Sequence, residues 1–241
     1  MATIEKKIPD FELGNAEFGL VNYQFDTLAL HAGTPPDPTT GAILTPIYQT
    51  TTYRQEAVGR DKGFTYSRSG NPTVSALEAR LAALEGAEFC TCYGTGLAAT
   101  TALCLALLRA GDRVVVSQAV YGGTVRLFRQ VLEPFGVHAE FVDTANEKAL
   151  TNALKTPTRF VFIETPANPT LKLTDIRLAA RLAKEAGALL VVETLPGSNR
   201  RRVRLDGIRH LRGLWMPVDA STWVSAWWGV LVCRLRQQQR D

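Results

Sequence analysis

The sequence predicts an α/β fold with a mostly parallel sheet flanked by helices, and two observations favour it. Between residues 71 and 193, short apolar stretches alternate with helical patterns of similar spacing. These stretches are continuous runs of Val, Ile, Leu and Phe, which are typical of strands covered on both faces. Strands that alternate with helices in this way form parallel sheets.

The elements are expected in a regular order along the chain. Asn71 is a suitable N-cap for the first helix, Pro72 suits its first turn, and Gly86 ends it. Its apolar stripe consists of Leu77, Leu81 and Leu84. The strands are expected at residues 88–93, 113–117, 139–142, 159–164 and 188–193. The later helices are expected at residues 97–110, within 122–136, near 146–155, and from the capping pair Thr174 and Asp175 to about Ala186.

Composition excludes several classes of protein. Hydrophobic residues make up 46% of the 241 residues and charged residues 21%, which excludes a disordered, collagen-like or disulfide-stapled chain. No apolar run approaches the roughly 18 residues of a membrane span, and the N-terminus has no apolar signal segment. The four cysteines form no CxxC pair and the three histidines are scattered, so no zinc site is expected. These features predict a soluble cytoplasmic protein.

Charge is distributed unevenly along the chain. Residues 1–193 carry a net charge of −2, whereas residues 194–241 carry +6, with nine Arg and no Lys. All four Trp residues also lie after residue 194. A basic arm for an acidic partner is one interpretation of this segment. An aberrant tail that is not an evolved sequence is the other.

Polar and aromatic residues follow the predicted strands, at the edge where ligands bind in open α/β sheets. The run 94–97 (Gly-Thr-Gly-Leu) opens a helix, whose first N–H groups favour an anion such as phosphate. Tyr121 on its glycine-rich loop could stack on a flat ring. Glu164 and Asn168 follow a later strand, and Glu193 at the last strand end could pair with a protonated ring nitrogen. Together these features indicate a site for pyridoxal 5'-phosphate (PLP).

Each feature also has an alternative interpretation. Residues 94–99 fit the dinucleotide pattern G-x-G-x-x-A, but that pattern expects an acidic residue after the next strand, and residues 113–121 contain none. Tyr121 alone could be a packed loop residue, and Glu164 alone could be a capping or salt-bridge residue. The shared position of these features at strand ends favours the PLP site over these alternatives.

Two segments, residues 26–53 and 62–88, resemble the N-terminal part of the PLP-dependent Cys/Met-metabolism enzymes. The run 66–73 (Tyr-Ser-Arg-Ser-Gly-Asn-Pro-Thr) is the most specific part of a resemblance that extends from about residue 24 to 193. Residues 62–64 and 120–136 are most similar to cystathionine γ-synthase and γ-lyase. The resemblance implies the large domain of a fold-type I PLP-dependent transferase, preceded by an N-terminal arm.

The resemblance implies a role for each matching residue. Tyr66 and Arg68 would bind the PLP phosphate of a neighbouring subunit, and the N–H groups of Gly96 and Leu97 would bind the same phosphate. Tyr121 would stack on the pyridine ring and take part in catalysis by assisting proton transfer. Asn168 would contact the hydroxyl group of the PLP ring, and Glu164 would support Asn168. Glu193 would lie at the pyridine nitrogen, where the family has Asp.

The resemblance is interrupted after Glu193. The family continues to a Ser-x-Thr-Lys motif, expected near residues 217–223, whose Lys forms the Schiff base with PLP. No Lys follows Lys184 in this chain, and Arg cannot replace it because a guanidinium stays protonated. The resemblance returns at residues 229–234, and the C-terminal domain of the family is expected to be missing from this chain. We therefore expect a truncated chain in which residues 194–228 translate a shifted reading frame.

These observations divide the chain into an arm or lid (residues 1–70), a partial PLP-binding α/β domain (71–193) and an aberrant basic tail (194–241). The resemblance implies a transferase or lyase of transsulfuration. Its reaction would be γ-replacement or γ-elimination on amino acids derived from homoserine or cysteine, within cysteine and methionine biosynthesis. The expected assembly is a homotetramer built as a dimer of dimers.

This chain is expected to be impaired or inactive, because PLP could bind only non-covalently without the lysine. The alternative is a non-catalytic α/β fragment that pairs with an intact subunit or only binds phosphate or PLP. A nucleic-acid-binding module around the basic residues 200–204 is a third hypothesis, but no binding fold surrounds that run. The expected partners are therefore a small amino-acid substrate and further copies of the chain, without nucleic acid or membrane.

Overall fold

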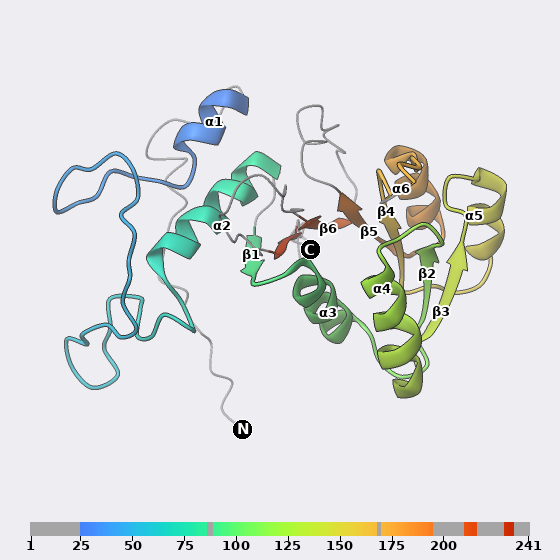
Figure 1. The fold of residues 1–241 in the computed structure, drawn as a ribbon, viewed down its shortest axis with the longest axis horizontal. Coiled ribbons are helices and arrows are strands. Elements are labelled where there is room, and N and C mark those ends of the chain that lie inside the picture. The colour runs from blue at the N-terminus through green and yellow to red at the C-terminus, as the bar shows by residue number, and fades with distance from the viewer. Residues whose placement is uncertain (1–24, 86–88, 168–169, 195–209, 216–228, 234–241) are drawn as a thin grey trace, which may run out of the picture. The chain divides into compact units, whose positions relative to one another are not determined.

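A computed structural model describes residues 25–85, 89–167, 170–194, 210–215 and 229–233. The chain divides into two compact units, Met1–Cys90 and Thr91–Asp241. The first unit holds the arm and the helix that follows it, and the second holds most of the sheet with its covering helices (Figure 1).

Among its described residues, the first unit contains two helices, α1 (Phe25–His31) and α2 (Pro72–Glu85), joined by a long irregular arm. Asn71 begins α2 as predicted, because its side chain accepts a hydrogen bond from the Thr73 N–H at 2.9 Å. The short helix α1 was not predicted. It is followed by Gly33 with φ of +68°, where a Cβ would lie 2.7 Å from the backbone of α2. Glycine is therefore required for the close approach of these two segments.

In the part of the chain that the structure describes, the sheet has seven strands in the order β1-β7-β6-β5-β4-β2-β3. Their bounds are β1 (Phe89–Tyr93), β2 (Arg113–Ser117), β3 (His138–Val142), β4 (Phe160–Glu164), β5 (Leu189–Thr194), β6 (His210–Trp215) and β7 (Gly229–Cys233). The pairs β3–β2, β2–β4, β4–β5 and β5–β6 are parallel, and β6–β7 is antiparallel. This arrangement confirms the predicted mostly parallel sheet.

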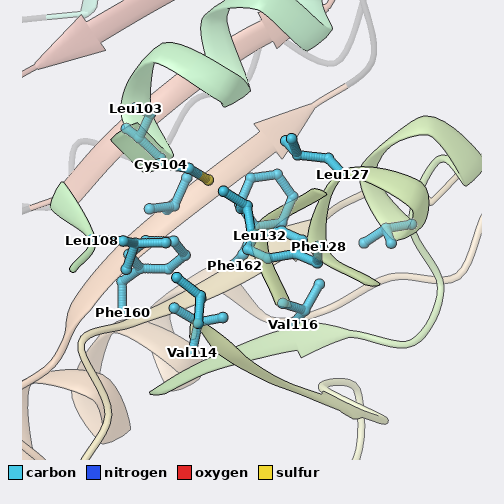
Figure 2. Close-up of a cluster of buried hydrophobic side chains, with 13 residues drawn as sticks. Leu103, Cys104, Leu108, Val114, Val116, Leu127, Phe128, Leu132, Phe160 and Phe162 are labelled. Carbon is cyan, nitrogen blue, oxygen red and sulfur yellow. The ribbon is translucent and has the colours of Figure 1, made fainter. Parts of the chain in front are cut away.

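Two hydrophobic clusters cover opposite faces of the sheet, because side chains alternate along each strand. The helices of the second unit are α3 (Gly96–Leu107), α4 (Gly122–Arg126), α5 (Glu147–Ala153) and α6 (Ile176–Glu185). The cluster in Figure 2 joins α3 and the segment after α4 to Phe162 and Val191. The other cluster joins α5 and α6 to Ile163 and Val192. The sheet face that α3 and α4 cover, called the α3 and α4 face below, is therefore the one to which the side chains of residues 162 and 191 point.

The predicted helix within residues 122–136 consists of three successive segments. After α4, a π-helix (Leu127–Leu132) and a 3-10 turn (Glu133–Phe135) lead to Gly136 with φ of +82°. Phe128 in the π-helix is fully buried between Phe160 and Phe162, with ring centroids 6.5 and 6.0 Å away in edge-to-face geometry. Packing of this ring against the sheet therefore stabilises the widened helix.

Strands and helices between residues 89 and 194 agree with the prediction to within a few residues at their ends. Strand β7 lies where the family resemblance returns, at residues 229–234. One further strand, β6, lies inside residues 194–228 and pairs with β5. The shifted reading frame stays a prediction, and the arginine-rich run 200–204 lies outside the described residues.

Candidate functional site

Two buried carboxyl groups lie side by side where strands β4 and β5 end. Glu164 is the last residue of β4, and it is the register partner of Glu193 on β5. Both side chains point to the α3 and α4 face, because they follow Phe162 and Val191 by two residues. Glu164 is 3% exposed and Glu193 is 6% exposed. The sequence placed both residues at strand ends, and the structure brings them together.

Tyr121 joins this pair from the loop after β2. Its backbone N–H donates a hydrogen bond to Glu164 Oε2 at 2.6 Å. Its carbonyl accepts from the N–H groups of Thr124 and Val125 at 2.9 and 3.2 Å, so the residue is the N-cap of α4. Because β2 and β4 are parallel neighbours, their following loops meet at one edge of the sheet. Glu164 therefore fixes the start of α4 at the carboxyl edge.

The ring of Tyr121 lies over the first turn of α4, and a glycine makes this possible. A Cβ added to Gly123 would fall on the ring, 2.9 Å from Cδ1 and nearer still to Cε1. Real Cβ atoms do not approach this closely, so any other residue at this position would displace the ring. At Gly122, the nearest atom to an added Cβ is the flexible end of Arg126 at 3.6 Å. The two adjacent glycines therefore have different roles.

Glu193 is the electrostatically unusual group of the site. Its Oε2 has no hydrogen-bond partner within the described part of the chain. Burial and, to a smaller degree, the charge of Glu164 raise the pKa of Glu193 from 4.5 to about 8. A buried polar atom without a partner is costly unless something else satisfies it. A ligand carrying a positively charged N–H would supply both a donor and a compensating charge.

The N-terminus of α3 provides anion-binding groups. Thr95 is its N-cap, with Oγ1 accepting from the Ala98 N–H at 3.0 Å and the carbonyl accepting from the Ala99 N–H at 3.2 Å. The N–H groups of Gly96 and Leu97 belong to the first turn, which helix geometry leaves without internal acceptors. Leu97 packs against the cluster that contains Val191. This helix start therefore lies over the same sheet face as Glu193.

Tyr66 and Arg68 lie in the first unit and contact each other there. The Arg68 guanidinium donates to Tyr66 Oη at 2.8 Å and lies 5.2 Å from the centre of its ring. An antiparallel β-bridge between Thr52 and Tyr66 holds the turn that contains Tyr66 and Arg68 against the preceding part of the arm. The two side chains thus form one polar pair, with a phenol and a guanidinium suited to phosphate oxygens.

Sequence reasoning missed two polar residues after β3, Asp143 and Thr144, which contact the loop after β4. Lys172 Nζ contacts Asp143 Oδ2 at 2.7 Å, and this hydrogen bond lowers the pKa of Asp143. The hydroxyls of Thr144 and Thr174 lie 2.9 Å apart in a buried hydrogen bond. The position of Asp143 and Thr144 directly after the strand 138–142 was the signal that could have indicated them. Asn168, predicted at the ring hydroxyl, lies outside the described residues.

Among the residues that the structure describes, no group of three or more His, Cys, Asp or Glu side chains is arranged to hold a metal ion. None of the helices in that part of the chain has the length and apolar character needed to cross a membrane.

The described residues of the second unit fit the predicted PLP cofactor without a covalent link. The α3 N-terminus offers N–H groups for a phosphate, the Tyr121 ring is a flat apolar surface, and Glu193 has an unsatisfied oxygen for a ring nitrogen. The observation that tests this fit is the buried Glu193 Oε2, which has no hydrogen-bond partner among the described residues and needs a ligand to supply one.

Comparison with known proteins agrees with this fit. The family profile described as "Cys/Met metabolism PLP-dependent enzyme" matches residues 26–198. A probable cystathionine gamma-synthase of Herpetosiphon aurantiacus is 44% identical over 194 residues, which cover 79% of this chain and 60% of that protein. The cystathionine gamma-lyase of Bacillus subtilis is 44% identical over 167 residues, covering 69% of this chain and 44% of the lyase.

Solved structures give the same result. The crystal structure of metB from Corynebacterium glutamicum matches with a TM-score of 0.78 and 35% identity, covering 88% of this chain and 56% of that one. The cystathionine gamma synthase of Xanthomonas oryzae pv. oryzae, solved in complex with aminoacrylate and cysteine, matches with a TM-score of 0.78 and 32% identity over 88% and 55%. The chain spans about half the length of the relatives it matches.

Proposed function

The chain belongs to the Cys/Met metabolism PLP-dependent enzymes, and from this membership we propose that residues 26–194 form the cofactor-binding part of a transsulfuration enzyme. Its reaction would be γ-replacement or γ-elimination on an amino acid derived from homoserine or cysteine. The observation that supports this proposal is the buried pair of Glu164 and Glu193 beside Tyr121. In this pair, Glu193 Oε2 has no hydrogen-bond partner among the described residues.

Four described residues of the second unit would hold PLP. The Gly96 and Leu97 N–H groups would bind its phosphate, Tyr121 would stack on its ring, and Glu193 would pair with its ring nitrogen. When bound, PLP supplies an electron-withdrawing ring that stabilises negative charge on the α-carbon of an amino acid. Glu193 supports this by keeping the ring nitrogen positively charged, and Glu164 holds the Tyr121 backbone in place.

Tyr66 and Arg68 would bind the phosphate of a second copy of the chain, so the site would be completed only in an oligomer. The arm supports this proposal, because it exposes large apolar side chains that a monomer leaves in water. The most exposed of them are Ile43, Leu44, Ile47 and Val58, each with more than 65% of its surface exposed in the chain alone.

Chemistry in this chain is proposed to be impaired, because the covalent anchor is missing after Lys184. The second candidate function is therefore a non-catalytic subunit that binds PLP and pairs with an intact relative. Steady-state turnover of cystathionine by the purified chain separates these two functions.

Titration with pyridoxamine 5'-phosphate, which needs no lysine, tests the proposed binding. Gly123→Ala is expected to weaken its binding about five- to tenfold, because the added Cβ displaces the stacking ring of Tyr121. Gly122→Ala is the matched control and should change the affinity less than about twofold, since Ala is favoured in a helix and its Cβ meets only the Arg126 side chain. Saturable binding with this order of affinities supports the proposal. No binding by the folded wild-type chain would refute it.

A further inference from the structure

Glu164 and Glu193 form a carboxyl pair whose two members have unequal surroundings. They are register partners on adjacent parallel strands, whose backbones lie about 4.8 Å apart. The Tyr121 N–H donates to Glu164, whereas no described group donates to Glu193 Oε2. Both side chains are more than nine-tenths buried. The pair is therefore asymmetric, because Glu164 Oε2 has a backbone donor and Glu193 Oε2 has none among the described residues.

The surroundings decide which member carries the charge. Two buried negative charges on neighbouring strands strongly repel each other, so one carboxyl retains a proton. A hydrogen bond from an N–H favours the ionised form, which assigns the charge to Glu164 and the proton to Glu193. Of the strands beside β5, β4 brings Glu164, and β6 brings Gly213 at the register position of Glu193. The helices over this face, α3 and α4, carry Arg126 as their charged residue, but the charge that acts on Glu193 is that of Glu164.

We propose that Glu164 is a positioning residue that sets the charge state of this site. The pair holds one negative charge, on Glu164, and one exchangeable proton, on Glu193, until a ring cation enters. When a protonated ring nitrogen enters, Glu193 would release its O–H proton to solvent, and its carboxylate would then pair with that cation. The ring cation in this inference is that of PLP, so its binding step rests on the proposed function.

Infrared titration of the chain without cofactor tests the proton on Glu193 directly. The C=O stretch of a buried protonated carboxyl should disappear as the pH rises through about 8, and it should be missing in Glu193→Gln. In Glu164→Gln, which keeps an oxygen to accept from Tyr121 but loses the charge, the same band should disappear at a lower pH. If the wild-type band is absent at neutral pH, or persists in Glu193→Gln, the inference is wrong, whether or not Glu164→Gln folds.

Calorimetry with pyridoxamine 5'-phosphate in two buffers of different ionisation enthalpy tests the linkage to binding. At about pH 6.5, where the ring nitrogen of the free probe is protonated, wild type should release close to one proton per probe bound. Glu193→Gln should release none, and Glu164→Gln should release fewer than wild type. If Glu164 only held the Tyr121 loop in place, Glu164→Gln would change the affinity for the probe without changing the number of protons released. Binding without proton release by wild type would overturn the inference. No binding at any pH would refute the proposed function, and the infrared titration would then decide the inference alone.

Discussion

Borohydride reduction of the chain after incubation with PLP is expected to leave no site-specific covalent pyridoxyl group, and turnover should be at least about a thousandfold below that of an intact relative. The physical reason is the missing amine, because a neutral lysine nitrogen is the nucleophile that attaches the aldehyde of PLP. The residues after Lys184 include nine Arg and no Lys, and a guanidinium does not lose its proton at neutral pH.

The two lysines nearest in sequence to the site do not replace the missing one. Lys172 Nζ is ion-paired at 2.7 Å with Oδ2 of Asp143, the residue that follows strand β3. Lys184 lies in the last turn of α6, which packs on the sheet face opposite to Glu193. A helix that begins at the carboxyl edge of the sheet ends near the other edge, so the end of α6 carries Lys184 away from the site.

Intact-mass and peptide-mass measurements after reduction check this prediction. Surface lysines react slowly with PLP in any protein, so the relevant adduct is the fraction that excess pyridoxamine 5'-phosphate prevents. The cystathionine gamma-lyase of Bacillus subtilis, treated in parallel, is the positive control. A stoichiometric adduct on Lys172 or Lys184 that the competitor abolishes would contradict the prediction and restore catalysis as a property of this chain.

The stability of the chain without cofactor is expected to fall by about 2–3 kcal/mol as the pH rises from 6 to 8. Glu193 has a pKa of about 8 in the folded state against 4.5 when unfolded, so the folded state binds more protons throughout this interval. The stability contributed by this proton is complete below the unfolded pKa and is lost as the pH rises through the folded one. This sign is opposite to that of a carboxyl with a lowered pKa, such as Asp143.

Urea unfolding at a series of pH values measures this loss. Glu193→Gln removes the titrating group while keeping its shape, so its stability should change by less than about 1 kcal/mol over the same interval. A parallel series with saturating pyridoxamine 5'-phosphate should show a smaller loss in wild type, because the ring cation stabilises the ionised carboxyl. An equal pH dependence in wild type and Glu193→Gln would mean that other groups cause it.

The sequence by itself determined the order and type of nearly all elements between residues 72 and 194. Continuous apolar runs indicated β2, β4 and β5, because both faces of these strands are covered. Capping residues such as Asp175, which accepts from the N–H groups of Arg177 and Leu178, marked the helix starts. The arm motif around Tyr66 and Arg68 indicated the family before any geometry was considered.

Local signals did not determine the segments that depend on distant contacts. Helix α1 has seven residues, too few for propensity to decide, and it contacts α2 some 40 residues later. The π-helix after α4 depends on Phe128 packing between two aromatic rings of β4. Both features follow from tertiary packing, which a short stretch of sequence does not contain.

The sequence identified Tyr121, Glu164 and Glu193 as separate candidates at three strand ends. Only the tertiary structure showed that the Tyr121 N–H is bonded to Glu164, and that Glu164 and Glu193 are register partners. Residue type and position along the chain follow from local pattern, but the charge of a buried carboxyl depends on its distance to other charges and on exclusion of water. Both quantities are set by which strands lie next to each other, and that is decided when the sheet assembles.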